Sequence, residues 1–85
     1  HAGGYFLRLH VTDQPGTMAT IATRMADEDI SLDSIVQRAT SDDGTATIVL
    51  VTHATTESAI RTALDGIRQD GRLAGDAQMI RIENI

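Results

Sequence analysis

The segment Asp13-Gln14-Pro15-Gly16-Thr17-Met18 combines residue types that could hold a small charged molecule. Its Pro-Gly pair turns the chain, and the apolar spacing that follows predicts a helix beginning at once. The backbone N–H groups of Gly16, Thr17 and Met18 would then point outward at the positive end of the helix dipole, which suits a carboxylate. The Asp13 side chain could accept a hydrogen bond from an ammonium group. This segment could therefore receive both charged ends of a free amino acid.

The same segment has a plainer interpretation. Asp13 would cap the helix, and the Pro15-Gly16 pair would only turn the chain, as such turns do in many proteins without a ligand. Judged from the residues alone, this interpretation is favoured over binding.

The residue types needed for catalysis or metal binding are not arranged for either. The sequence contains no cysteine, so it offers neither a thiolate nucleophile nor a disulfide. His1, His10 and His53 lie far apart, and no two of them have the i, i+4 spacing of a helical zinc site. The acidic run at 27–29 is typical of a solvated helix end. We therefore expect no catalytic residue, no metal site and no cofactor in this chain.

Length and charge narrow the class of protein. The 85 residues leave room for one domain, which we expect to span residues 1–85. Hydrophobic residues make up 41% and charged residues 22%, as in folded soluble chains. The net charge of −5 disfavours nucleic acid and anionic membrane surfaces as partners. No apolar run approaches the ~20 residues of a membrane span, and no signal-peptide pattern is present, so we expect a cytoplasmic protein.

Apolar periodicity predicts the elements that position the segment. Alternating and i, i+3, i+4 patterns predict strands over 5–11, 30–38, 45–52 and 79–83 and helices over 18–29 and 55–70. Thr55 is the expected N-cap of the second helix and Gly71 its expected end. Imperfect alternation around Asp33 and Ser34 indicates a strand with a bulge or an exposed edge, and we expect an edge strand. The turn at 41–44 should join this strand to the next as a hairpin.

This order is two strand-helix-strand units of similar length. Such units normally interleave, which predicts an α+β, ferredoxin-like βαββαβ sandwich with an antiparallel sheet of order 4-1-3-2. Both helices should lie on one face. The other face should carry Phe6, His10 and part of the apolar set of the third strand, which makes it a candidate association surface.

At the turn the sequence resembles a known family. Residues 13–21, read as Asp-Gln-Pro-Gly-Thr-Met-Ala-Thr-Ile, resemble the D-x-P-G-x-L/M-x-x-I signature of ACT domains. Further segments resemble the C-terminal domain of homoserine dehydrogenases, and they lie at residues 1–9, 30–32, 35–37, 48–53 and 80–83. The resemblance spans nearly the whole chain.

The resemblance implies a regulatory domain that binds a pathway end product, with threonine as the expected ligand. Such domains usually pair, through a sheet edge or the open sheet face, and hold the amino acid between two copies. Catalysis, the interconversion of aspartate semialdehyde and homoserine with NAD(P), would belong to a region outside this chain. The implied site residues are Asp13, Gln14, Gly16, Thr17 and Met18 of one copy and Ser31 of the other. Two positions depart from the family pattern, because relatives commonly carry Gly at Asp29 and some carry Asn at Ser31.

Two other functions remain as alternatives. One is a structural dimerisation domain of the same enzyme, with the turn empty and the bare sheet face joining subunits. The other is an RNA-binding module, since RNA-recognition motifs share this topology. Such modules need exposed aromatic residues on a basic face, whereas here only Tyr5 and Phe6 are aromatic and the net charge is negative.

Overall fold

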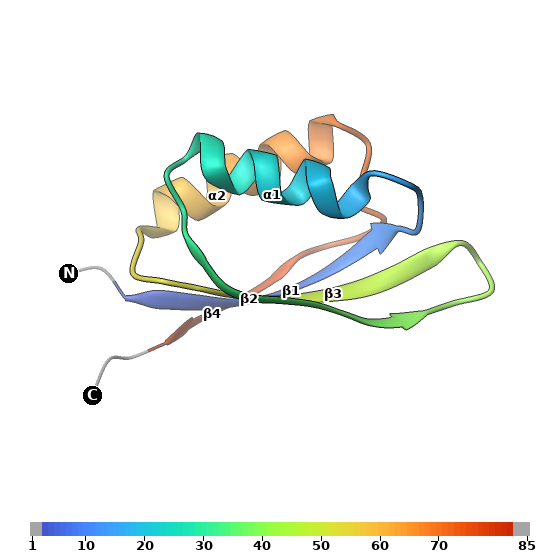
Figure 1. Ribbon diagram of the computed structural model, residues 1–85, viewed down its shortest axis with the longest axis horizontal. Helices are drawn as coiled ribbons and strands as arrows, with labels where there is room; N and C mark the ends of the chain where they lie inside the picture. The colour runs from blue at the N-terminus through green and yellow to red at the C-terminus, as the bar shows by residue number, and fades with distance from the viewer. Residues whose placement is uncertain (1–2, 83–85) are drawn as a thin grey trace.

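The computed structural model describes residues 3–82. Its elements follow the predicted order: β1 Gly4–Thr12, α1 Thr17–Asp27, β2 Leu32–Thr40, β3 Thr45–Thr52, α2 Glu57–Gln69 and β4 Gln78–Ile82. The sheet order is β2-β3-β1-β4, with every neighbouring pair antiparallel, which is the predicted order 4-1-3-2 read from the opposite edge. Figure 1 shows both helices on one face of this sheet. The ferredoxin-like sandwich is confirmed. His1 and Glu83, the latter the expected end of the last strand, lie outside the described residues.

Alternation along the two central strands builds the core. Leu7, Leu9 and Val11 of β1 face the helices and are almost completely buried, as are Ile48 and Leu50 of β3. Burial of each such side chain favours folding by about 1.5–3 kcal/mol. The helices supply the opposing layer with Ile21 and Met25 from α1 and Ile60, Ala63, Leu64 and Ile67 from α2. The core therefore holds the end of β1 and the start of α1 in fixed positions.

The face of the sheet away from the helices is open in the part of the chain that the structure describes. Phe6 lies there between Val51 of β3 and Ile80 of β4. Ile80 is 58% exposed and Val36 is 44% exposed. The expected bare face with apolar side chains is thus present.

β2 is the edge strand that the sequence predicts. Its pairing with β3 shifts register between Leu32 and Ser34 and again between Gln37 and Ala39. Each shift places an extra residue opposite β3, which bends the strand. The strand thus has both the edge position and the bulge that the sequence offered as alternatives, and a second bulge that the apolar pattern does not show.

α1 ends at Asp27, two residues before the expected end near Asp29. Asp29 adopts the left-handed conformation, with φ 57°, and the Ile30 N–H donates to the Met25 carbonyl at 3.0 Å. This is a Schellman motif, in which Ile30 also packs in the core beside Met25. Asp therefore takes the backbone conformation for which relatives commonly use Gly.

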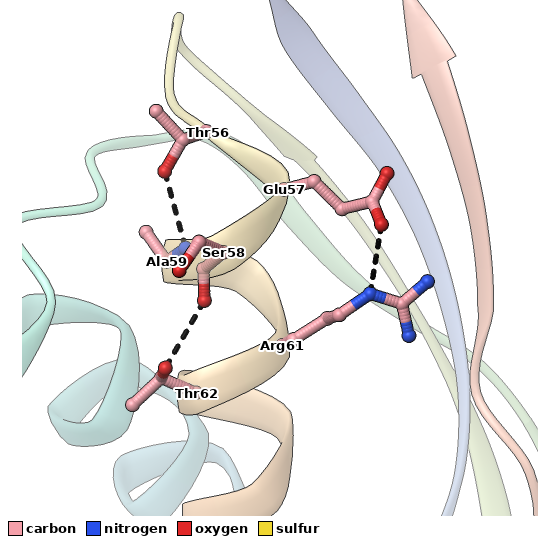
Figure 2. A network of polar contacts seen from close by, with 6 residues as sticks. All are labelled: Thr56, Glu57, Ser58, Ala59, Arg61 and Thr62. Carbon is pink, nitrogen blue, oxygen red and sulfur yellow. Dashed lines mark hydrogen bonds and ion pairs between the residues drawn. The ribbon is translucent and has the colours of Figure 1, made fainter.

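The predicted cap of α2 is wrong by one residue. Thr56, not Thr55, is the N-cap, and its Oγ1 accepts a hydrogen bond from the Ala59 N–H at 3.1 Å (Figure 2). The Thr55 N–H instead donates to the Gly3 carbonyl at 3.0 Å, which keeps the chain extended for one more residue. At the other end Gly71, with φ 75°, follows the C-cap Asp70, as expected.

An ion pair links Arg24 of α1 to Asp70, the C-cap residue of α2. The Arg24 guanidinium donates to both carboxylate oxygens of Asp70, at 2.8 and 2.7 Å. The Arg24 side chain passes so close to Gly66 that a Cβ there would lie 2.7 Å from its Cδ. The presence of glycine, a poor helix former, at position 66 of α2 is thus explained by the close approach of the Arg24 side chain of α1. Neither helix between residues 3 and 82 has the length and apolar character needed to cross a membrane.

Candidate functional site

The loop from Asp13 to Gly16 joins β1 to α1 and is held in place by its backbone. The Asp13 N–H donates to the Gly44 carbonyl in the β2–β3 hairpin at 2.9 Å, and the Gln14 N–H donates to the Thr12 carbonyl at 3.1 Å. Gly16 is the N-cap of α1 and has φ 87°, a conformation that disfavours any residue with a Cβ. The loop therefore reaches the helix along one defined path.

The expected set of free backbone amides is only partly correct. The Thr17 N–H donates to the Gln14 carbonyl at 3.2 Å, so the prediction that it points outward unpaired is wrong. The amides of Gly16, Met18 and Ala19 have no hydrogen-bond partner among residues 3–82. This stretch is an α-helix N-terminus with unsatisfied donors, as helix geometry requires when no side chain caps it.

Thr17 has a structural contact rather than an exposed side chain. It is only 4% exposed, and its Oγ1 donates to the Thr12 carbonyl at 2.9 Å. This bond ties the first turn of α1 to the end of β1. Thr17 thus helps to shape the loop from the inside.

Asp13 does not cap the helix. α1 has no side-chain cap hydrogen bond, and the exposed carboxylate of Asp13 makes no hydrogen bond or ion pair within the described range. The plainer interpretation of this residue is therefore wrong. Asp13 is exposed, three positions before Gly16.

Arg72, which the sequence analysis does not single out, contacts the loop from another part of the chain. It lies in the α2–β4 connection, and its Nη1 donates to Gln14 Oε1 at 2.8 Å and to Thr17 Oγ1 at 3.3 Å. Its carbonyl also accepts a hydrogen bond from the Thr12 N–H at 2.9 Å. Gln14 and Arg72 are 58 residues apart, so no local pattern could reveal their contact.

Ser31 lies away from this loop. It is exposed just before β2, and its carbonyl accepts a hydrogen bond from the His53 N–H at 2.9 Å. In Figure 1 the loop stands at one end of α1 and the chain returns to β2 at the other end. Because α1 has 11 residues, the two ends are separated by about 16 Å. One copy of the chain does not bring Ser31 to the Asp13 loop.

The neighbouring hairpin is stabilised by its own polar contacts. Thr45 donates to Asp43 Oδ1 through its hydroxyl at 2.6 Å and through its N–H at 3.2 Å. The hydroxyl contact in particular lowers the pKa of the Asp43 carboxyl below its usual value. Residues 3–82 contain no group of three or more His, Cys, Asp or Glu side chains that could hold a metal ion.

Comparison with known proteins adds to this geometry. The family model described as ACT domain matches residues 5–69. A homoserine dehydrogenase from Neisseria gonorrhoeae is 36% identical over 81 residues, which are 95% of this chain and 19% of that protein. A homoserine dehydrogenase from Pseudomonas aeruginosa is 33% identical over 82 residues, with the same coverage of 95% and 19%.

A solved structure agrees with these relatives. The homoserine dehydrogenase from Thiobacillus denitrificans superposes with a TM-score of 0.85 at 33% identity, covering 99% of this chain and 18% of that one. The chain thus spans about a fifth of the length of these relatives. With the sandwich topology, the Asp13–Gly16 turn and the family match in agreement, this chain belongs to the ACT domain family.

Proposed function

We propose that this chain is the amino-acid-binding regulatory domain of a homoserine dehydrogenase and that its ligand is threonine. The identity of 33–36% to enzymes of that name supports the parent protein. The rest of such a protein would carry the NAD(P)-dependent oxidoreductase chemistry in the cytoplasm. This domain would supply regulation alone.

The observation that carries the proposal is the uncapped start of α1. The unpaired amides of Gly16 and Met18 would donate to the ligand's carboxylate, where the helix dipole favours a negative charge. The free carboxylate of Asp13 would accept from the ligand's ammonium group. Both charged ends of an amino acid thus have a counterpart on one loop.

Pairing of two copies would complete the site. β2 is an edge strand, so its outer backbone groups can join a second copy. Ser31 stands at the start of this strand and would contact the ligand held by the partner's Asp13 loop. A ligand bound between copies favours the paired state, which is how binding would change a property of the parent enzyme.

Calorimetric titration of the 85-residue chain tests the proposal. Threonine should bind saturably, and the Asp13→Asn variant should bind at least about tenfold more weakly, because a charged hydrogen bond contributes about 1.5–3 kcal/mol. Asp65→Asn, an equal change of charge on the exposed face of α2, is the matched control and should bind as the native chain does. Isoleucine, methionine, lysine and serine test ligand choice. Absence of heat with all five amino acids at millimolar concentration would contradict the proposal.

A structural dimerisation domain is the second candidate, favoured by the exposed apolar side chains of the open sheet face, with Ile80 58% exposed. It predicts a dimer in sedimentation that threonine does not affect. The Ile80→Asp variant should then be monomeric. A dimer that forms or tightens only with threonine would favour the regulatory function instead.

A further inference from the structure

Within residues 3–82, the Arg72 guanidinium donates hydrogen bonds to the Asp13 loop through only one nitrogen, Nη1. Nη1 is used by the chain, since it donates to Gln14 Oε1 and Thr17 Oγ1 at 2.8 and 3.3 Å. Both acceptors are neutral oxygens. These two bonds link Arg72 to Gln14, the second residue after β1, and to Thr17, the first residue of α1, and so fix the outline of the loop.

The other end of the guanidinium lies near Gly16. Nη2 makes no hydrogen bond within residues 3–82, and it lies 3.8 Å from the position that a Cβ on Gly16 would occupy. A guanidinium carries its donors in a planar fork, which lets one nitrogen stay bonded to the loop while the other binds a carboxylate oxygen. Nη2 thus lies near a residue whose own backbone amide is unpaired within residues 3–82.

The charge of Arg72 is not neutralised by a bonded carboxylate, as it is at three other arginines. Arg24, Arg61 and Arg68 each donate to a carboxylate, at 2.7, 2.8 and 3.4 Å. The positive charge of Arg72 contributes to lowering the pKa of the Asp70 carboxyl, but both oxygens of that carboxylate are hydrogen-bonded to Arg24. Arg72 therefore differs from these three in lacking a hydrogen-bonded carboxylate.

We propose that Arg72 is a further ligand-binding residue, with Nη1 holding the loop and Nη2 donating to the carboxylate of the bound amino acid. This inference rests on the proposed function and adds a residue from the α2–β4 connection to a site otherwise built from one loop. A carboxylate at the start of α1 would then meet backbone amides on one side and a guanidinium on the other.

The test compares the native chain with Arg72→Gln and with the matched control Arg68→Gln, which removes an equal charge from an exposed, paired position. Each is titrated with threonine and with threoninamide, which lacks the carboxylate charge. Threonine binding should weaken about tenfold or more in Arg72→Gln and less than about twofold in Arg68→Gln. The preference for threonine over threoninamide should fall by a similar factor in Arg72→Gln alone.

The outcomes separate this inference from the function on which it rests. If the native chain binds no amino acid, the proposed function and the role of Arg72 fall together. If the native chain binds threonine and Arg72→Gln binds it equally well, only the role of Arg72 falls. If Arg72→Gln weakens the binding of threonine and of threoninamide by the same factor, Arg72 only shapes the loop, and direct contact with the carboxylate is overturned.

A measurement on the native chain covers the case in which Arg72→Gln does not fold. In ¹⁵N spectra of the guanidinium groups, threonine should shift the Arg72 signals and leave those of Arg68 in place. Unchanged Arg72 signals at saturating threonine would overturn the inference.

Discussion

The chain passes from a central strand into a helix twice, and the two connections are built differently. After β3, Thr56 caps α2 through its side chain, and Glu57 in the first turn accepts a hydrogen bond from Arg61 Nε at 2.8 Å (Figure 2). After β1, Gly16 caps α1 with backbone alone, and the first turn has no acidic residue. Both helices pack on the same face of the same sheet (Figure 1). The difference therefore lies in what each sequence supplies at the helix start.

This contrast shows which connection is left open to a ligand. At α2 a hydroxyl occupies the Ala59 amide and a carboxylate already stands at the positive end of the dipole. At α1 the corresponding Ala19 amide is unpaired, as is that of Met18, among the residues described. An added anion would gain hydrogen bonds at α1 and would meet a like charge at α2.

The largest effect is expected from Gly16→Ala. At φ 87° an alanine is strained by about 1–2 kcal/mol, and relief of that strain would move the amides of the α1 start. Urea unfolding should show this loss, and calorimetry should show threonine binding weakened by at least about tenfold. Gly71→Ala is the matched control, because φ is 75° and no atom lies within 4 Å of the added Cβ. It should lose similar stability. Threonine binding by Gly16→Ala equal to that of the native chain would remove the distinction between the two connections.

Thr56→Ala should lower the free energy of unfolding by about 1 kcal/mol, because the Ala59 amide loses its cap. Threonine binding should not change, since α2 has no part in the site. Thr55→Ala, one residue away, should cost less than about 0.5 kcal/mol because no hydrogen bond of its side chain is seen in the described structure. Thermal unfolding followed by circular dichroism measures both, and a larger loss at Thr55 would place the cap where the sequence first suggested.

Asp29→Gly should raise stability by about 0.5–1 kcal/mol, because Gly adopts the left-handed conformation at φ 57° without a steric cost. Asp29→Ala should instead lower stability by about 1 kcal/mol. The Schellman bonds at the end of α1 lie far from the Asp13 loop of the same copy. A destabilising Asp29→Gly would show that the carboxylate itself stabilises this helix end.

The smallest effect is expected from Asp70→Asn and depends on pH. The hydrogen bonds and charge of Arg24 lower the pKa of the folded Asp70 carboxyl below its unfolded value of about 3.9. This stabilising contribution is present above about pH 4 and disappears as the pH falls through the lowered folded-state pKa. The native melting temperature should therefore fall more between pH 5 and strongly acidic pH than that of Asp70→Asn. Identical acid profiles would show that the Arg24–Asp70 pair does not stabilise the fold.

The sequence predicts more of the fold than of the candidate site, because the two depend on contacts of different range. Apolar spacing is local, so strands such as Thr45–Thr52 and the helix stripe at Ile21 and Met25 are readable from neighbours alone. The cap shifted from Thr55 to Thr56 because the extended chain continues through a bridge to Gly3, a partner 52 residues away. Short-range patterns do not contain such a contact.

The site depends on contacts that the sequence does not display. The Gly16 turn and the free carboxylate of Asp13 follow from their residue types, yet the bond from the Thr17 amide to Gln14 depends on how tightly the turn closes. Arg72 reaches the loop because the connection after α2 pairs with the end of β1, where the Thr12 N–H donates to the Arg72 carbonyl. Pairing of copies, on which the proposed role of Ser31 depends, involves a second chain.

The most direct test of the central claim, that the α1 start is the open connection, is a titration of the ¹⁵N-labelled chain with threonine observed through its backbone amides. The amide signals of Gly16 and Met18 should move in proportion to saturation, while those of Ser58 and Ala59 at the start of α2 stay in place. Movement of the α2 signals with Gly16 and Met18 unchanged would contradict the account.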